Sequence, residues 1–208
     1  MAPVQFYFDP ACPWTWITSR WVVDVAGQRG FEIIWKTFSL HHHNRDNPSY
    51  DWIRGRREHR LAGLRVIDAA RARSGNDAVG RLYTAFGTLI HHDEDKALTS
   101  MADGIAAAGL PADLIDAASD TSWDAGIEAS TDEAVAIVGK DVGIPVIIVD
   151  GARSTFFGPV ISPAPTGAEA CDLWDAFLAL GRFDGVWELK RTRTVPPVFG
   201  ARPALISN

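Results

Sequence analysis

One cysteine near the amino terminus stands where a reactive thiol is expected. Cys12 lies in the segment Asp9-Pro10-Ala11-Cys12-Pro13-Trp14-Thr15, between the apolar run of residues 4–8 and a second apolar run from residue 16. Pro13 suits the first position of a helix, because its missing N–H would be unpaired there anyway. Free N–H groups and the positive end of a helix dipole stabilise a thiolate more than a thiol. We therefore predict that Cys12 is a nucleophile whose pKa lies below that of an ordinary thiol.

Thr15 follows Cys12 by three residues, one helical turn further along. A threonine hydroxyl can donate a hydrogen bond to a thiolate and keep it charged, but it cannot form a disulfide. The predicted chemistry is therefore that of a single thiol. The alternative for Cys12 is a buried cysteine that acts as a small apolar residue, the commoner fate of a free cysteine. That alternative is the better interpretation of Cys171, which lies among acidic residues in a helical pattern.

The elements around Cys12 follow from hydrophobic spacing. Residues 4–8 have the aromatic and β-branched composition of a strand, and residues 31–40 indicate a second strand. Between them, Ile17, Trp21 and Val25 recur at helical spacing. A strand, a helix and a strand in this order predict a parallel pair with a right-handed crossover.

From about residue 50 to residue 140 the sequence predicts helices only. Breaks at residues 75–76, 91–93 and 109–111 divide this part into several helices, and the histidine pair at 91–92 is interpreted as a solvated turn. Strands return at residues 144–149 and 155–158, and the intervening Asp150-Gly151 predicts an antiparallel hairpin. Residues 167–180 then form a predicted amphipathic helix. Its apolar face consists of Cys171, Trp174, Phe177 and Leu178.

The Cys-Pro-aromatic-X turn between a strand and a helix resembles the active site of the thioredoxin superfamily. The proline and the aromatic residue that follow the cysteine are closer to those of DsbA-like members than to those of thioredoxin. Pro145 stands at the start of the strand-like run 144–149, whose interior would normally exclude proline, and it matches the cis-proline of that superfamily. The alternative is an ordinary trans proline at the first position of a strand, which is more frequent in general. The resemblance implies that Pro145 faces Cys12 and that the backbone of Ile144 contacts a bound thiol or peptide.

The predicted fold class is α/β, a thioredoxin fold with a large all-helical insertion, as in DsbA-like proteins and kappa-class transferases. The expected organisation is a first part of the thioredoxin-fold domain in residues 1–45, the helical insertion in 46–140, and the second part with a C-terminal segment in 141–208.

A narrower resemblance spans nearly the whole chain. The sequence looks like the actinobacterial mycothiol-dependent nitroreductase family, which uses a Cys-Pro-Trp-Cys site with the thiol mycothiol to reduce disulfides and some nitroaromatic compounds. This resemblance implies mycothiol as a co-substrate and implies substrate contacts at Trp14, Asn44 and Tyr50. The motifs that carry it are Phe8-Asp9-Pro10, Cys12-Pro13-Trp14, Trp16-Ile17-Thr18-Ser19-Arg20-Trp21, Ser39-Leu40, Asn44-Arg45-Asp46, Leu82-Tyr83-Thr84-Ala85, Asp141-Val142-Gly143, Phe156-Phe157-Gly158-Pro159-Val160 and Glu188-Leu189-Lys190-Arg191-Thr192-Arg193-Thr194.

The composition and the motifs of the sequence argue against several classes of partner. The chain has 208 residues and a formal net charge of −6, which argues against nucleic acid as a main partner. Its apolar runs are too short to span a membrane, and the first strand begins too early to leave room for a secretory signal, so we expect a cytoplasmic protein. The sequence contains no phosphate-binding glycine loop, so no bound nucleotide is predicted. His41, His42 and His43 are expected in a polar loop at the edge of the active-site cleft beside Cys12. No metal site is predicted there, because consecutive residues of an extended segment point to opposite sides and cannot easily face one ion.

Three functions remain open at this stage. The first is a thiol-dependent oxidoreductase in which Cys12 attacks, Thr15 holds the thiolate, and Trp14, Asn44 and Tyr50 line the pocket of a small disulfide or electrophile. The second is a thiol transferase or isomerase similar to kappa-class transferases and hydroxychromene carboxylate isomerases, which place a hydroxyl residue in a similar motif. The third is a ligand- or peptide-binding protein without redox turnover. The expected assembly is a monomer or a homodimer.

Overall fold

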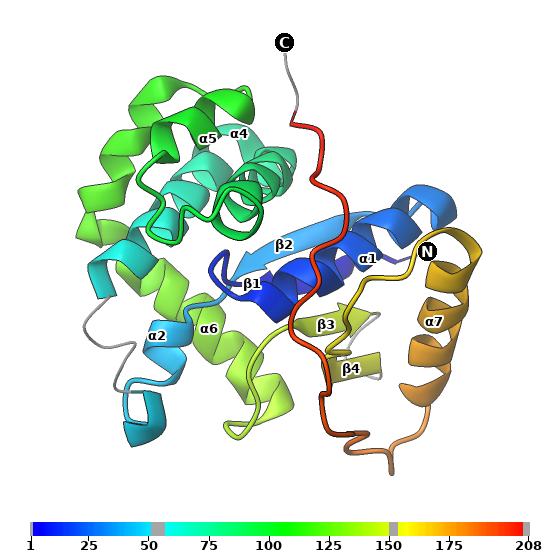
Figure 1. Ribbon diagram of the computed structural model, residues 1–208. Coiled ribbons are helices and arrows are strands. Elements are labelled where there is room, and N and C mark those ends of the chain that lie inside the picture. The colour runs from blue at the N-terminus through cyan, green and yellow to red at the C-terminus, as the bar shows by residue number, and fades with distance from the viewer. Residues whose placement is uncertain (1, 51–56, 150–153, 206–208) are drawn as a thin grey trace.

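A computed structural model describes residues 2–50, 57–149 and 154–205 of the chain. It contains one sheet with helices on both of its faces (Figure 1). The short 3-10 helices are labelled η. In chain order the elements are β1 (Val4–Phe8), α1 (Pro13–Arg29), β2 (Ile33–Thr37), α2 (Leu40–His43), η1 (Pro48–Tyr50), α4 (Arg57–His91), α5 (Met101–Ala107), η2 (Ala112–Ser119), η3 (Thr121–Trp123), α6 (Asp124–Val138), β3 (Val146–Val149), β4 (Ser154–Phe157) and α7 (Gly167–Leu180).

The sheet has the strand order β2-β1-β3-β4. β1 runs parallel to β2 and antiparallel to β3, and β4 runs antiparallel to β3, so the predicted parallel pair and the predicted antiparallel pair are both confirmed. The Asp150-Gly151 turn itself lies outside the described residues. β2 is shorter than predicted, because Ser39 leaves the strand and its side chain accepts a hydrogen bond from the backbone N–H of His42 at the start of α2.

β1 divides the hydrophobic core into two parts, because alternate side chains of a strand face opposite sides of the sheet. Val4, Phe6 and Phe8 join the main cluster with residues of α1, α4 and α7. Tyr7 faces the other side, where it packs with Ala134 of α6. α1 and α7 are joined by Trp21, whose indole N–H donates to the carbonyl oxygen of Ala170 over 2.9 Å. This packing fixes the helix that begins at Cys12.

The described elements between β2 and β3 are all helices, as predicted. α4 is interrupted at Gly75, whose φ of 78° and ψ of −171° are outside the helical region. Asn76 then bonds the outer edge of β2, accepting from the N–H of Trp35 and donating to the carbonyl of Ile33. The breaks predicted at residues 75–76, 91–93 and 109–111 are confirmed, by the kink at Gly75, the end of α4 at His91 and the gap between α5 and η2.

The architecture is that of a thioredoxin fold with a helical insertion, as the sequence predicted. The domain boundaries at residues 45 and 140 stay a prediction. Among the described residues, no helix combines the length and the hydropathy needed to cross a membrane.

Candidate functional site

Cys12 caps the amino end of α1, where the sequence placed it. Its backbone is extended, with φ −84° and ψ 112°, and Pro13 occupies the first helical turn. The Cys12 N–H donates to the carbonyl of Asp9 over 3.0 Å, and the Cys12 carbonyl accepts the N–H of Trp16 over 3.0 Å. The side chain is 7% exposed. The thiol therefore lies just inside the surface, at the end of the helix that carries the positive dipole.

Asp9 fixes the loop in front of Cys12. One carboxylate oxygen accepts the N–H of Ala11 over 2.9 Å, and the other accepts the N–H of Leu40 over 3.1 Å. Leu40 is the first residue of α2, so this single buried carboxylate ties the active-site loop to the segment that follows β2. Sequence reasoning did not single out Asp9, although an aspartate two residues before a turn N–H is a common side-chain-to-backbone pattern.

A stripe of α4 holds the first turn of α1 through Trp16, which is fully buried. Tyr83 meets the Trp16 ring edge-on at 5.6 Å between centroids, and the His91 ring stacks on it at 5.8 Å. Between them, a Cβ atom at Gly87 would lie 2.1 Å from Cζ3 of Trp16. Tyr83, Gly87 and His91 recur every four residues, so they share one face of α4.

His91 also holds the loop itself. Its Nε2 lies 2.9 Å from the carbonyl oxygen of Pro10, two residues before Cys12. A carbonyl only accepts hydrogen bonds, so Nε2 carries the proton. Burial lowers the pKa of His91 to about 4, so the ring is neutral at physiological pH. The interpretation of residues 91–92 as a solvated turn is therefore wrong for His91, which is 6% exposed. The available signal was its position four residues after Gly87 and eight residues after Tyr83, on the same face of a helix.

This environment predicts a contribution of His91 to acid sensitivity. The folded pKa is about 4 and the ordinary value is 6.5, so between these pH values only the unfolded chain binds the proton. Stability therefore falls as the pH drops through this window, by about 3 kcal/mol. His91→Gln keeps an N–H donor for Pro10 and cannot titrate. Urea unfolding of both proteins should show a smaller acid loss for the variant, and parallel curves across the window would contradict the assignment.

The predicted acidity of Cys12 is wrong for this arrangement of the site. Burial raises the pKa of the Cys12 thiol, and the nearby charge of Asp9 raises it further. The side-chain and backbone hydrogen bonds from Thr15, and that from the Trp14 backbone, lower the pKa of the thiol by less. The cause of the burial is an apolar cluster that Cys12 shares with Phe38 and Ile144. Such a thiol becomes a thiolate only where hydrogen-bond donors or positive charges near the sulfur offset the burial.

Thr15 is placed to provide one of these interactions. The residue is fully buried, and its hydroxyl has no hydrogen-bond partner of ordinary geometry among the described residues. The hydroxyl lowers the pKa of the Cys12 thiol, which places it near the sulfur. A buried donor without another partner favours the charged form of a neighbouring sulfur, because only that form accepts strongly.

The Ile144–Pro145 pair lies on the Cys12 side of the sheet. The Ile144–Pro145 peptide bond is cis, as are those at Gly158–Pro159 and Ser162–Pro163. Ile144 is buried in the same cluster as Cys12, and the Pro145 carbonyl accepts the N–H of Gly158 over 2.8 Å. The structure thus brings together residues that are more than a hundred positions apart in the sequence.

The three residues implied as substrate contacts have different surroundings. Trp14 is half-buried, with the guanidinium of Arg193 4.8 Å above its ring centroid. Asn44 is 8% exposed, and its amide donates to the Leu40 carbonyl over 2.9 Å at the end of α2. Tyr50 ends η1 with an exposed side chain. Contact of Asn44 and Tyr50 with a substrate stays a prediction.

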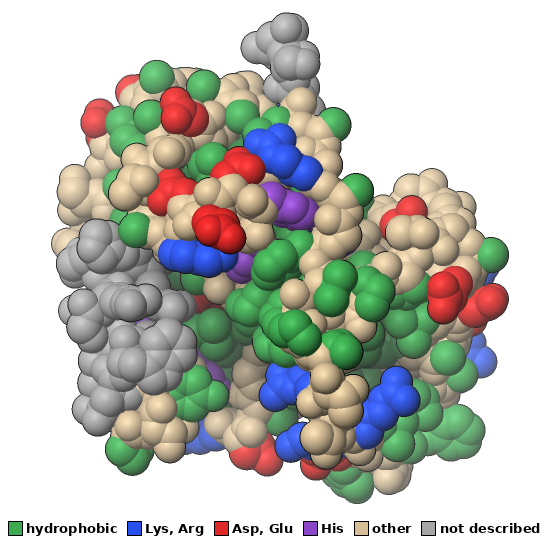
Figure 2. All heavy atoms as spheres, viewed as in Figure 1, with side chains coloured by type: hydrophobic (Ala, Val, Ile, Leu, Met, Phe, Trp, Pro, Cys, Tyr) green, Lys and Arg blue, Asp and Glu red, His purple; other side chains and the backbone are tan. Residues whose placement is uncertain are grey.

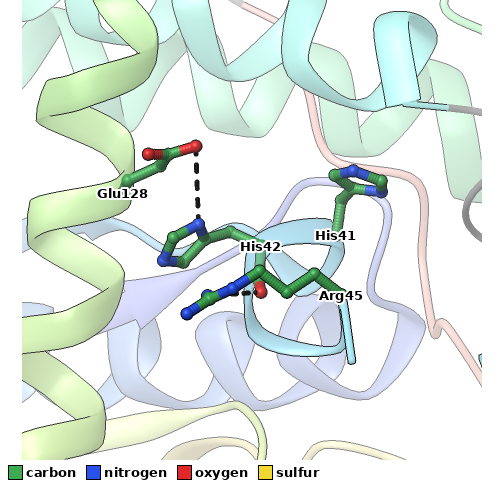
Figure 3. Close-up of a pocket in the computed structure, with 4 residues that line it drawn as sticks. All are labelled: His41, His42, Arg45 and Glu128. Carbon is green, nitrogen blue, oxygen red and sulfur yellow. Dashed lines mark hydrogen bonds and ion pairs between the residues drawn. The ribbon is translucent and has the colours of Figure 1, made fainter. Parts of the chain in front are cut away.

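The consecutive histidines do not form the predicted extended loop. They make the single turn of α2, because the Ser39 side chain caps it. His42 lies between two carboxylates of α6, with Nδ1 3.4 Å from Glu128 and Nε2 3.0 Å from Asp132. Together with His41 and Arg45, His42 and Glu128 line a hollow of about 160 Å³ (Figure 3). Within residues 2–50, 57–149 and 154–205, no group of three or more side chains is suited to hold a metal ion.

Comparisons with known proteins agree with this geometry. The family described as Rv2466c-like, mycothiol-dependent nitroreductase Rv2466c, matches residues 11–191. The uncharacterized protein Rv2286c of Mycobacterium tuberculosis is 32% identical, over 93% of this chain and 84% of that protein. The crystal structure of the probable DsbA oxidoreductase SCO1869 from Streptomyces coelicolor has the same fold, with a TM-score of 0.57 and 16% identity over 92% of this chain and 94% of that one.

Proposed function

Because the chain belongs to the family of Rv2466c-like, mycothiol-dependent nitroreductases, we propose that Cys12 exchanges with a low-molecular-weight thiol, mycothiol, to reduce a disulfide or a small electrophile. The family and the DsbA-like fold make the protein a thiol-dependent oxidoreductase. Nitroaromatic compounds are the electrophiles that the family name points to. The proposed location is the cytoplasm, where low-molecular-weight thiols are kept reduced.

The observation that carries this proposal is the pairing of Cys12 at a helix start with a hydroxyl one turn later. The Cys12 thiolate attacks one sulfur of the substrate, the substrate S–S bond breaks, and the departing thiolate takes up a proton. A first mycothiol attacks the Cys12 sulfur of the mixed disulfide, releases the second substrate thiol and remains bound to Cys12 through a disulfide. A second mycothiol attacks the sulfur of the bound mycothiol, regenerates the Cys12 thiolate and leaves as mycothiol disulfide. Two equivalents of mycothiol supply the two electrons for each disulfide reduced and leave as an oxidised product.

Other side chains have positioning roles in this proposal. Thr15 donates to the Cys12 thiolate, and the Ile144 backbone with Pro145 aligns the incoming thiol. Trp14 forms a flat apolar wall beside the sulfur, which suits a planar substrate. Asn44 and Tyr50 remain candidates for the outer part of the same pocket.

The buried hydroxyl of Thr15 also favours a second function, thiol transfer or isomerisation. A hydroxyl whose available acceptor is a sulfur could equally activate a bound thiol that attacks an electrophile and stays attached to it. In transfer the product contains a new carbon–sulfur bond, in isomerisation the thiol is released unchanged, and neither reaction oxidises the thiol. Thiol oxidation therefore distinguishes the two functions.

Removal of Cys12 tests the proposal. Oxidation of mycothiol should be followed with a disulfide substrate and, separately, with a nitroaromatic compound. Cys12→Ser is expected to fall to the uncatalysed rate, because a neutral hydroxyl cannot replace the thiolate. Cys171→Ser is the matched control and should keep full activity, since Cys171 lies on α7. Substantial activity in Cys12→Ser would contradict the proposal, and a thioether product without thiol oxidation would favour the transferase.

A further inference from the structure

The described C-terminal segment, residues 181–205, passes over α1 in Figure 1, and its Arg193 lies over Trp14 in the first turn of that helix. Ser162 anchors its middle, donating to the Pro196 carbonyl over 3.1 Å and accepting the Val198 N–H over 2.9 Å. Further along, the Phe199 ring packs 5.1 Å from that of His91, and Arg202 forms two hydrogen bonds with Asp93. The segment has no helix or strand of its own, so these contacts determine its path.

The anchored segment brings Arg193 to the edge of the site. The Arg193 guanidinium lies over Trp14, and Trp14 packs against the cluster that contains Cys12. Arg193 is exposed, Trp14 is half-buried and Cys12 is buried, so the three side chains lead from the surface inward. Figure 2 shows Lys and Arg side chains beside hydrophobic ones on this face.

The charge of Arg193 is available to a ligand. The ion pairs between described residues involve neither Arg193 nor its exposed neighbours Lys190 and Arg191. A guanidinium that lies over an aromatic ring keeps its N–H donors at its edge, where they can bind a carboxylate in bidentate fashion. This basic run stands out in a chain with a net charge of −6.

We propose that Arg193 determines specificity and favours disulfides and electrophiles that carry a carboxylate or another anionic group next to the reacting bond. The inference rests on the proposed function of Cys12. A thiolate that attacks an anionic disulfide brings two negative charges together, and the buried carboxylate of Asp9 adds a third nearby. Arg193 offsets this repulsion, because its positive charge is placed at the entrance before the substrate arrives.

The test uses stoichiometric exchange, in which Cys12 forms a bond to one sulfur of the reagent and the other sulfur leaves as a coloured thiol or thione. The reagents are dithiobis-nitrobenzoate, which carries two carboxylates, and the neutral dithiodipyridine. Both are mixed with a Cys171→Ser background, so that one thiol reacts. Arg193→Gln should slow exchange with the anionic reagent roughly tenfold at low ionic strength, with little change for the neutral one. Arg193→Lys should restore most of the anionic rate.

Arg191→Gln is the matched control, because it removes the same charge from the same segment without the Trp14 contact. It should slow the anionic reagent far less than Arg193→Gln does. An equal loss with both reagents would overturn the inference, since Arg193 would then act only by holding Trp14, and unchanged rates would overturn it too. These results leave the proposed function standing, whereas failure of Cys12 to react with either reagent contradicts both.

Discussion

Replacing Thr15 with cysteine is expected to raise the rate of disulfide reduction by roughly a hundredfold or more, because an intramolecular thiol replaces a second external one. Thr15 lies one turn from Cys12, is fully buried, and lowers the pKa of the Cys12 thiol through its hydroxyl. The introduced thiolate attacks the Cys12 sulfur of the mixed disulfide, expels the bound thiol, and leaves an internal disulfide that mycothiol reduces. Consumption of a model disulfide at fixed mycothiol concentration measures the gain.

Thr15→Val is the matched control for this gain. It nearly keeps the shape of threonine but removes the hydroxyl, so the pKa of Cys12 should rise and exchange near neutral pH should slow. If Thr15 instead supports transfer, Thr15→Cys should lose the transfer reaction, since the new thiol discharges the Cys12-bound or activated thiol. Wild-type disulfide reduction that is already fast and does not improve in Thr15→Cys would contradict the role of Thr15 in setting the reaction type.

The second large effect is a loss of stability at the face of α4 formed by Tyr83, Gly87 and His91, which packs against Trp16. Gly87→Ala is expected to destabilise the protein by about 3 kcal/mol, at the upper end of the usual cost of overpacking a core. The added methyl group would lie 2.1 Å from Cζ3 and 2.2 Å from Cε3 of Trp16. Trp16 cannot retreat easily, because Tyr83, His91 and the guanidinium of Arg20 surround it. Urea unfolding measures the change in free energy.

Gly27→Ala is the matched control on α1. Gly27 is exposed, lies within the helix, and has no atom within 4 Å of an added Cβ. Alanine there should stabilise the protein by up to about 1 kcal/mol, since it has the higher helix propensity. Equal free energies of unfolding for Gly87→Ala and the wild type would mean that Trp16 is not confined as described.

The sequence predicted those elements whose pattern is local. The helix of residues 167–180 coincides with α7, because its apolar spacing is regular and Gly181 follows it. The strand over residues 31–40 was too long, since the cap formed by Ser39 turns an apolar, strand-like continuation into α2. The histidines of α2 were therefore assigned the wrong backbone, because a single serine cap outweighs the composition of the run.

Within the site, the position of Cys12 was predictable and its environment was not. A proline after the cysteine and an apolar helix beyond it place the thiol at a helix start. Its burial depends on Phe38 and Ile144, which come from other parts of the chain, and this burial reverses the expected direction of the pKa shift. The roles of His91 and Arg193 likewise arise from tertiary contacts with the loop and with Trp14.

The central claim is that Cys12 is a single nucleophilic thiol, and identification of its oxidised form tests that claim most directly. The wild-type protein should be incubated with oxidised mycothiol and analysed by intact mass and by non-reducing peptide mapping. The account predicts one mycothiol attached through a disulfide to Cys12, stable until free thiol is added, with Cys171 unmodified. Recovery of a Cys12–Cys171 peptide as the main oxidised species, or of mycothiol on Cys171 alone, would contradict it.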